Sequence, residues 1–295
     1  MKIRNMLGPM RLPFLILPPT SVLLGLGVAV HDSARIDLTS LLLALLGSSA
    51  ALLSINALNE YEDFRSGLDL RTDRTPFSGG SGTLPAMPEM ASKVLGIGVI
   101  ALLLTILVGL YLVYRKGLML LSLGLPGVLI IISYTRWITG SPAICLVAPG
   151  LGLGPIMVMG TYFVLTGTFS WTAFAASLPP FFQASNLLLL NQFPDVEADR
   201  IVGRRHLPIV FGRRAASIVF CIISTLAYLS IVVGVYRGVL PRGTLLGMLA
   251  LALALPAALG TLRNADDIPN LIPAMGLNIA ATVATPVLVA IGFFL

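Results

Sequence analysis

Nine long apolar stretches, separated by shorter polar connections, run along the 295-residue chain. A helix needs about twenty mostly apolar residues to cross the hydrocarbon core of a bilayer, and each stretch is close to that length. The pattern predicts an all-α, polytopic membrane protein with about nine transmembrane helices. The predicted spans are residues 12–31, 39–59, 92–114, 117–135, 143–166, 172–190, 214–236, 240–262 and 271–295.

Composition supports the bilayer as the solvent of this chain. Hydrophobic residues make up 56% of the sequence and charged residues only 11%, and the mean hydropathy is +0.93. A soluble domain carries roughly a quarter charged residues. Several spans contain proline, which membrane helices tolerate when neighbouring groups satisfy the freed backbone. We therefore expect residues 1–295 to form a single transmembrane domain.

Basic residues predict the orientation of the spans. With the N-terminus inside, 14 of the 19 Lys and Arg residues fall in cytoplasmic segments and 5 in outer ones. This bias favours a cytoplasmic N-terminus in a prokaryotic inner membrane. The first span is interpreted as an uncleaved helix because no small-x-small site follows it. No basic stretch is interleaved with aromatic residues, so the net charge of +6 does not indicate a nucleic-acid partner.

Acidic residues gather in two polar connections, at 56–76 and 191–208, which begin where the second and sixth spans end. The two connections lie four spans apart, as if one half-unit were used twice. They hold eight of the chain's 13 acidic residues, namely Glu60, Glu62, Asp63, Asp69, Asp73, Asp195, Glu197 and Asp199.

Helical spacing places the polar residues of each connection on one face. Asn56, Asn59 and Asp63 follow i, i+3 and i+7, and Asn191, Asp195 and Asp199 follow i, i+4 and i+8. If both faces point into one cavity, the carboxylates repel one another unless a cation offsets their charge. Oxygen ligands shared with phosphates suit Mg²⁺. The candidate metal residues are Asp63, Asp69, Asp195, Asp199, Asn59 and Asn191.

Flanking residues allow two interpretations. Solvated loops with helix-capping Asn and Asp explain either connection alone, whereas two matched connections beside arginines favour a diphosphate site. The candidate diphosphate ligands, Arg71, Arg74, Arg204 and Arg205, also fit plain topology charges. Tyr134 and Tyr162 are candidates to face a carbocation or an acceptor ring, or else to anchor and pack helices. Residues 77–88 are either a flexible cover over the site or a polar linker.

At these positions the sequence resembles the UbiA superfamily of intramembrane prenyltransferases. Asn59, Asp63 and a later aspartate match the first Asp-rich motif of that superfamily, and Asp195 and Asp199 match the second, D-x-x-x-D. Within it, N-E-Y-E-D-F-R-S-G-L-D at 59–69 is similar to the 1,4-dihydroxy-2-naphthoate polyprenyltransferase branch of menaquinone synthesis. So are G-G-S-G-T-L-P at 79–85, G-T-Y-F-V-L-T-G at 160–167 and D-R-x-x-G-R-R from Asp199.

The resemblance implies a helical bundle around a central cavity and Mg²⁺-dependent transfer of a prenyl group from a polyprenyl diphosphate to an aromatic acceptor. It implies that the site opens to the cytoplasm, with acidic motif loops at about 59–90 and 191–213. The implied catalytic residues are Asp63, Asp195, Asn59 and Asp199, and the implied acceptor or cation pocket holds Tyr134, Tyr162 and Asn56.

Three residues depart from the naphthoate-branch pattern, and two rival functions remain open. Glu60, Pro194 and His206 stand where that branch usually has Asp, Arg and Thr. The acceptor therefore stays open between dihydroxynaphthoate, 4-hydroxybenzoate, homogentisate and glycerol phosphates. A membrane transporter with two repeats and a noncatalytic membrane scaffold are the rivals of a different class.

Overall fold

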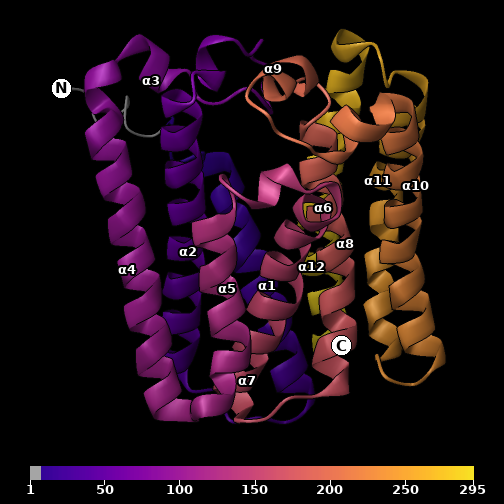
Figure 1. Ribbon diagram of the computed structural model, residues 1–295. Coiled ribbons are helices and arrows are strands. Elements are labelled where there is room, and N and C mark those ends of the chain that lie inside the picture. Colours follow the sequence, from indigo (N-terminus) through magenta and orange to yellow (C-terminus); the bar gives the residue numbers. More distant parts are fainter. Residues whose placement is uncertain (1–7) are drawn as a thin grey trace.

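The chain folds into a bundle of long, roughly parallel and antiparallel helices, seen in a computed structural model that describes residues 8–295 (Figure 1). Within that range no strand is present. The membrane-length elements are α2 (Leu38–Arg65), α4 (Ala91–Lys116), α8 (Trp171–Asn191), α10 (Leu207–Tyr236) and α12 (Ile268–Phe294). The 15-residue α1 (Leu17–His31) reaches that length together with the 3₁₀ turn before it, over Leu12–His31. Two further long elements are composite: α6 (Pro142–Leu151), the π-helical η7 (Gly152–Met159) and α7 (Gly160–Thr166) run on continuously, as do η8 (Arg242–Ala250) and α11 (Leu251–Arg263).

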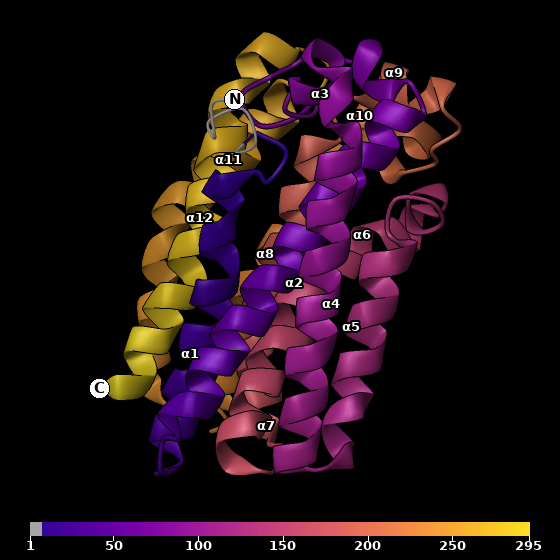
Figure 2. The ribbon, with the colours of Figure 1, turned by 90° about the vertical axis from the view of Figure 1, so that its left-hand side faces the viewer.

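Shorter elements complete the chain. A 3₁₀ turn, η5 (Leu118–Leu120), leads into α5 (Leu121–Ser133), which is much shorter than its neighbours. The remaining short elements are η2 (Leu12–Ile16), η3 (Leu68–Leu70), α3 (Thr83–Ala86), η4 (Pro88–Met90), η6 (Ile138–Gly140) and α9 (Val196–Ile201). In two perpendicular views α3 and α9 lie at the same end of the bundle (Figures 1 and 2).

The predicted spans agree with the helices in number but not all in length. Within residues 8–295, eight helices are long and apolar enough to cross a membrane, and the predicted fourth span corresponds to the shorter apolar helix Leu118–Ser133. At 1.5 Å per residue that helix reaches about 24 Å, short of the roughly 30 Å hydrocarbon core. The predicted span runs on to 135, but the helix ends at Ser133 and the backbone turns from Tyr134 onward. The basic residues Lys2 and Arg4, used to predict orientation, lie outside the described residues.

Helix ends are set by local capping groups. The Asp37 carboxylate accepts a hydrogen bond from the Thr39 N–H at 3.1 Å and from the Ser40 hydroxyl at 2.7 Å, which starts α2. Gly67 ends that helix with a φ of +77°, a conformation that suits glycine. Because α2 then stops at Arg65, the acidic residues of the first motif lie in its last turns and in the loop that follows.

Small residues let two pairs of neighbouring helices pack closely, one around α8 and the other around α2. A Cβ on Gly150 or Gly154 would lie within 3 Å of atoms of α8, so the stretch from α6 to η7 packs its backbone directly on that helix. In the same way, Gly98 lets α4 approach α2, where the Ser54 hydroxyl donates to the Gly98 carbonyl at 2.8 Å. The close packing fixes the height at which α2 and α8 end, and so the height of the two acidic motifs.

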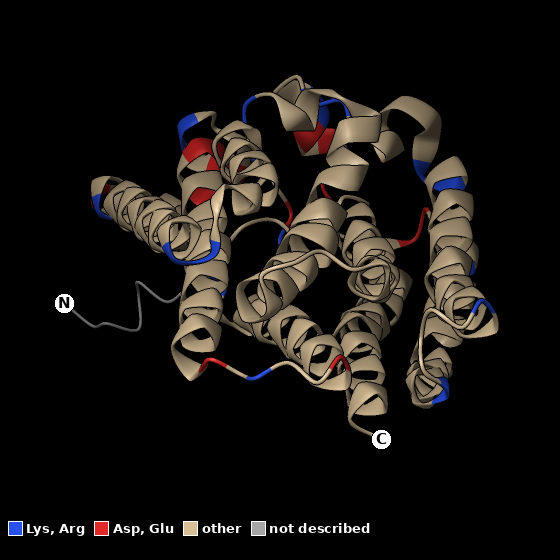
Figure 3. Ribbon diagram, turned by 90° about the horizontal axis from the view of Figure 1, so that it is seen from below, with Lys and Arg blue, Asp and Glu red and all other residues tan. Residues whose placement is uncertain are grey.

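Charged residues are confined to helix ends and loops in the described part of the chain, while the helix shafts are apolar (Figure 3). Many large apolar side chains point outward, for example Leu107 on α4 with 64% exposure and Leu129 on α5 with 64%. An exposed apolar belt between charged rims is the surface that a bilayer covers. The chain is therefore an integral membrane protein.

Candidate active site

Both acidic motifs line one polar cavity of about 90 Å³ at the α3–α9 end of the bundle. The end of α2 and the loop after it contribute Asn59, Asp63 and Asp69, as the sequence predicts. The end of α8 contributes Asn191, the turn before α9 contributes Asp195, and α9 itself contributes Asp199. All six candidate metal residues thus come together, although up to 140 positions separate them along the chain.

Arg204 links the two motifs across this cavity. Its Nη1 donates to Asp199 Oδ1 at 2.8 Å, and its Nη2 pairs with Asp63 Oδ1. His206 Nε2 lies 2.8 Å from the other oxygen, Asp199 Oδ2. The arginine side chain is only 15% exposed, so its charge is buried together with the two carboxylates that it contacts. Of the four candidate diphosphate arginines, Arg204 is the one that lines the cavity.

Asp69 and Asp195 lack such a partner. Asp69 Oδ2 and Asp195 Oδ1 are buried, and neither atom has a hydrogen-bond partner in the described structure. Burial, followed by the nearby negative charge of Glu60 and Asp63, raises the pKa of Asp69 to about 7. Burial, followed by the charge of Asp199, raises the pKa of Asp195 to about 7. The nearby arginines lower both pKa values only in part, and a cation bound between the two carboxyls would further favour their charged forms.

The donor set of the cavity fits Mg²⁺ without forming a complete protein cage. Asp, Asn, Ser and Thr side chains contribute oxygen atoms to the lining, and two of the carboxylate oxygens have no hydrogen-bond partner in the described structure. Among residues 8–295, no three His, Cys, Asp or Glu side chains lie close enough together to hold a metal ion by themselves. Mg²⁺ typically takes one or two carboxylates and fills its shell with waters and substrate phosphates. This arrangement suits an ion that arrives with a phosphorylated substrate.

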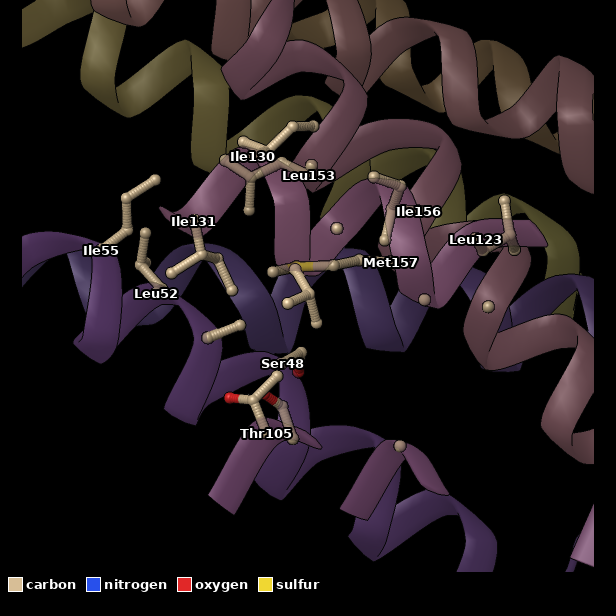
Figure 4. Close-up of a pocket in the computed structure, with 18 of the residues that line it drawn as sticks. Ser48, Leu52, Ile55, Thr105, Leu123, Ile130, Ile131, Leu153, Ile156 and Met157 are labelled. Atoms are coloured by element: carbon tan, nitrogen blue, oxygen red, sulfur yellow. The ribbon is translucent and has the colours of Figure 1, made fainter. Parts of the chain in front are cut away.

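A second, apolar cavity of about 480 Å³ continues from the polar one. Arg11, Asn59, Tyr134, Leu188 and Asn191 line both cavities and mark where they meet. From Asn59 the larger cavity follows α2 down to Leu43, sixteen residues or about 24 Å along the helix axis. Figure 4 shows its walls, built by side chains such as Leu52 and Ile55 of α2, Ile131 of α5 and Ile156 and Met157 of η7.

Two other predicted pocket residues also lie at this junction. Asn56 lines the apolar cavity one turn below Asn59, and its Nδ2 donates to the Met10 carbonyl at 3.3 Å. Tyr134, just after α5, lines both cavities. These residues come from three separate segments, so the mouth of the apolar cavity is formed only in the folded bundle.

The remaining candidates are not part of either cavity. Arg71 and Arg205 are exposed, and Arg74 donates from Nη2 to the backbone carbonyl of Asp69 at 3.2 Å. Tyr162 lies at the opposite end of the bundle, where its hydroxyl donates to Asp32 Oδ2 at 2.7 Å. The structure therefore does not bring Tyr162 together with the acidic motifs.

Arg11 and Glu60 lie at the site, although neither was among the candidate site residues: Glu60 was noted only as an acidic residue of the first motif that departs from the naphthoate-branch pattern. Arg11 entered only as a topology charge, yet it lines both cavities. Glu60 is fully buried beside the site, with 0% exposure. Arg11 Nη2 lies 3.9 Å from Glu60 Oε2. A signal for Arg11 was present in the sequence, since it immediately precedes the first span on the side where both motifs are predicted.

Comparison with known proteins agrees with this architecture. A sequence model of the UbiA prenyltransferase family matches residues 17–271. The chain is 27% identical over 262 residues to the 1,4-dihydroxy-2-naphthoate octaprenyltransferase of Bacillus subtilis (strain 168), covering 86% of this chain and 80% of the relative.

Solved structures share the fold at low sequence identity. A UbiA homolog from Archaeoglobus fulgidus bound to GPP and Mg²⁺ superposes with a TM-score of 0.65 at 15% identity, covering 97% of this chain and 99% of the other. The apo UbiA homolog from Aeropyrum pernix K1 gives 0.65 at 16% identity, over 96% and 97%. A digeranylgeranylglyceryl phosphate synthase gives 0.63 at 15% identity, over 99% and 98%.

Proposed function

The chain belongs to the UbiA prenyltransferase family and is a prenyltransferase, and we propose that it transfers a polyprenyl group to 1,4-dihydroxy-2-naphthoate in menaquinone synthesis. One observation carries the proposal: a 24 Å apolar cavity opens into a polar cavity lined by both acidic motifs. An allylic diphosphate has the same division, with a long hydrocarbon tail and a doubly phosphorylated head. The sequence similarity to the Bacillus subtilis enzyme supports the naphthoate acceptor.

The residues of the polar cavity have separable tasks. Asp69 and Asp195 carry free oxygens that would hold Mg²⁺, with Asn59 and Asn191 as further oxygen donors in the same cavity. Bound there, the ion would offset negative charge on the diphosphate. Arg204 presents a second positive charge between Asp63 and Asp199. These groups orient the head, so that the first carbon of the prenyl tail lies where the two cavities meet.

The transfer breaks the bond between the first prenyl carbon and the diphosphate oxygen, and the electron pair leaves with the diphosphate. An electron pair of the acceptor ring then forms the new carbon–carbon bond, and with dihydroxynaphthoate the carboxylate is lost as CO₂. Water must be kept away, because it would convert the allylic cation to an alcohol. The apolar walls below Asn56 provide this exclusion, and Tyr134 presents an aromatic ring at the junction.

Orientation follows from the charged rims. Of the Lys and Arg residues among positions 8–295, twelve lie toward the end that carries the acidic motifs and five toward the other. The positive-inside rule assigns the end with the acidic motifs to the cytoplasm. Diphosphate and acceptor would therefore enter from the cytoplasmic side of the inner membrane.

A transporter fits this chain less well than a prenyltransferase. The chain is a member of a prenyltransferase family, and its acidic residues lie at the ends of α2 and α8 instead of halfway along them, where coupling-ion sites are found. A noncatalytic scaffold would leave the buried, unpartnered carboxylate oxygens without a use.

Turnover by the purified protein in nanodiscs tests the proposal. The protein would receive Mg²⁺, a labelled polyprenyl diphosphate and, in parallel, dihydroxynaphthoate, 4-hydroxybenzoate, homogentisate or a glycerol phosphate. We expect a prenylated, decarboxylated naphthoquinol by mass spectrometry, lost with EDTA or with Asp63→Asn. A product formed only from another acceptor would overturn the naphthoate assignment and keep the reaction class. Product formation that persists in EDTA would refute the metal requirement.

A further inference from the structure

A short backbone segment, Ser78–Gly82, forms one wall of the polar cavity, and we call it the strap. Gly79, Gly80 and Gly82 have φ values of +84°, +72° and +72°, which side chains with a Cβ rarely adopt. Ser78, Gly79 and Gly80 line the cavity. A Cβ on Gly80 would lie 2.7 Å from Asp69 Oδ1. The strap backbone therefore lies directly against Asp69, one of the two residues that have a carboxylate oxygen without a partner.

The same segment also reaches the second acidic motif. Gly79 of the strap lines the same cavity as Asp195, and its backbone is a hydrogen-bond partner of the Asp195 carboxylate. The strap is thus shared between the two halves of the site. Its position helps to set the space between Asp69 and Asp195.

Glu60 holds the strap in this position. Its carboxylate accepts from the Ser81 N–H, at 3.0 Å to Oε1 and 3.2 Å to Oε2, and also accepts from the Ser81 hydroxyl. The Ser81 hydroxyl oxygen in turn accepts from the Thr83 N–H at 3.1 Å, where α3 begins. Hydrogen bonds to a carboxylate are roughly twice as strong as neutral ones. Within the described chain, Ser81 is the residue that donates hydrogen bonds to this buried carboxylate.

We propose that Glu60 is a positioning residue, which fixes the strap through Ser81 and so sets the diphosphate-binding space between Asp69 and Asp195. The proposal rests on the proposed function for the identity of the ligand, a diphosphate. Glu60 does not line the polar cavity and acts through the strap. A group with only a structural role would change the stability of the fold without a selective effect on the diphosphate.

Three variants and one control separate these roles. Ser81→Ala removes the hydroxyl and Glu60→Gln removes the charge, and the double variant combines them. Glu62→Gln is the matched control, because Glu62 stands on the same helix, pairs with Arg136 at 2.8 Å and lines neither cavity. Two readouts are needed: KM for the allylic diphosphate against KM for the acceptor, and the rate of trypsin cleavage after the exposed Arg71 and Arg74.

Loss of a charge-assisted contact predicts a rise of about ten-fold in KM for the diphosphate in Glu60→Gln and in Ser81→Ala. KM for the acceptor should stay near the wild-type value, and the double variant should be no worse than Glu60→Gln, because Ser81→Ala acts on the Glu60–Ser81 contact that Glu60→Gln already weakens. Trypsin should cleave both variants faster than the wild type and the Glu62→Gln control. Equal cleavage rates in all proteins, or fully additive effects on KM, would overturn the proposal. If the wild type turned over no diphosphate, the proposed function would fail, while the cleavage rates would still test the link between Glu60 and the strap.

Discussion

Substitutions placed at increasing depth in the apolar cavity should shorten the prenyl tail that the enzyme accepts. Ala51, Ser48 and Ala44 line the cavity on one face of α2 and carry small side chains. They lie eight, eleven and fifteen residues before Asn59, or about 12, 16 and 22 Å down the helix axis. Each isoprene unit adds four chain bonds of about 1.5 Å and so about 5 Å of extended length. Phenylalanine at these positions should therefore leave room for about two, three and four units.

The size of the effect follows from what the excluded tail loses. A tail that leaves the cavity stays in the hydrocarbon of the bilayer, so its hydrophobic burial is largely unchanged. What remains is the cost of overpacking, about 1–3 kcal/mol, which corresponds to roughly a 5- to 150-fold fall in kcat/KM. The fall should begin at a donor length set by the position, and donors shorter than that length should react at the wild-type rate.

The assay measures kcat/KM with donors of two, three, four and more isoprene units. Leu46→Phe serves as the control on the same helix, because Leu46 is 45% exposed on the outer surface and does not line the cavity. The longest donor that reacts at the wild-type rate should lengthen from the Ala51 variant to the Ser48 variant to the Ala44 variant, which would support tail binding along α2. The assignment of the cavity to the tail would be refuted if all three variants lowered kcat/KM equally for every donor. It would also be refuted if the length cut-off moved in another order.

Three further predictions concern Asp69 and Arg11 at the polar cavity and Tyr162 at the opposite end of the bundle. Because the pKa of Asp69 is raised to about 7, the metal-free fold binds more protons than the unfolded chain between about pH 4 and 7, so the free energy of unfolding should fall as the pH rises through that window. Thermal unfolding in EDTA should show a flatter dependence of stability on pH for Asp69→Asn than for the wild type. An unchanged dependence would contradict the raised pKa of Asp69. Arg11→Gln should weaken the binding of one anionic substrate by about ten-fold, because Arg11 lines both cavities where they meet; equal KM values for donor and acceptor in variant and wild type would count against this. Tyr162→Phe should cost about 1 kcal/mol of stability through its lost bond to Asp32 and leave kcat/KM unchanged, whereas a large kinetic effect would place the tyrosine in the site.

Hydropathy and helical spacing predicted the parts of this protein that depend on local sequence. The spans follow from runs of apolar residues, and the shared helix face of Asn59 and Asp63 follows from their separation. Such patterns also placed both motifs at the same end, because α2 and α8 run in the same direction through the membrane. The end of the fourth span was predicted two residues too late, at 135, because a hydropathy window does not locate the turn that begins at Tyr134.

Hydropathy and helical spacing did not predict contacts between segments that are far apart in the sequence. Arg204 contacts Asp63 across 141 positions, and nothing in its neighbourhood distinguishes it from Arg205, which is exposed. Tyr162 is a different case. It stands near the end of a span that runs away from the cytoplasm, so the predicted alternation of spans already placed it far from the acidic motifs. Its place in the motif G-T-Y-F-V-L-T-G suggested a pocket residue, but the direction of its span excludes that position.

The link from Arg204 to Asp63 also has a consequence for biogenesis. Synthesis proceeds at about 5–20 residues per second, so the 141 residues between the two take roughly 7–28 s to follow. During that interval α2 and its acidic end are already made, while the arginine that will neutralise them does not yet exist. A chain that stalls in its second half therefore leaves Asp63 without the arginine that pairs with it in the folded protein, whereas Glu60 and Glu62 already have Arg11 and Arg136.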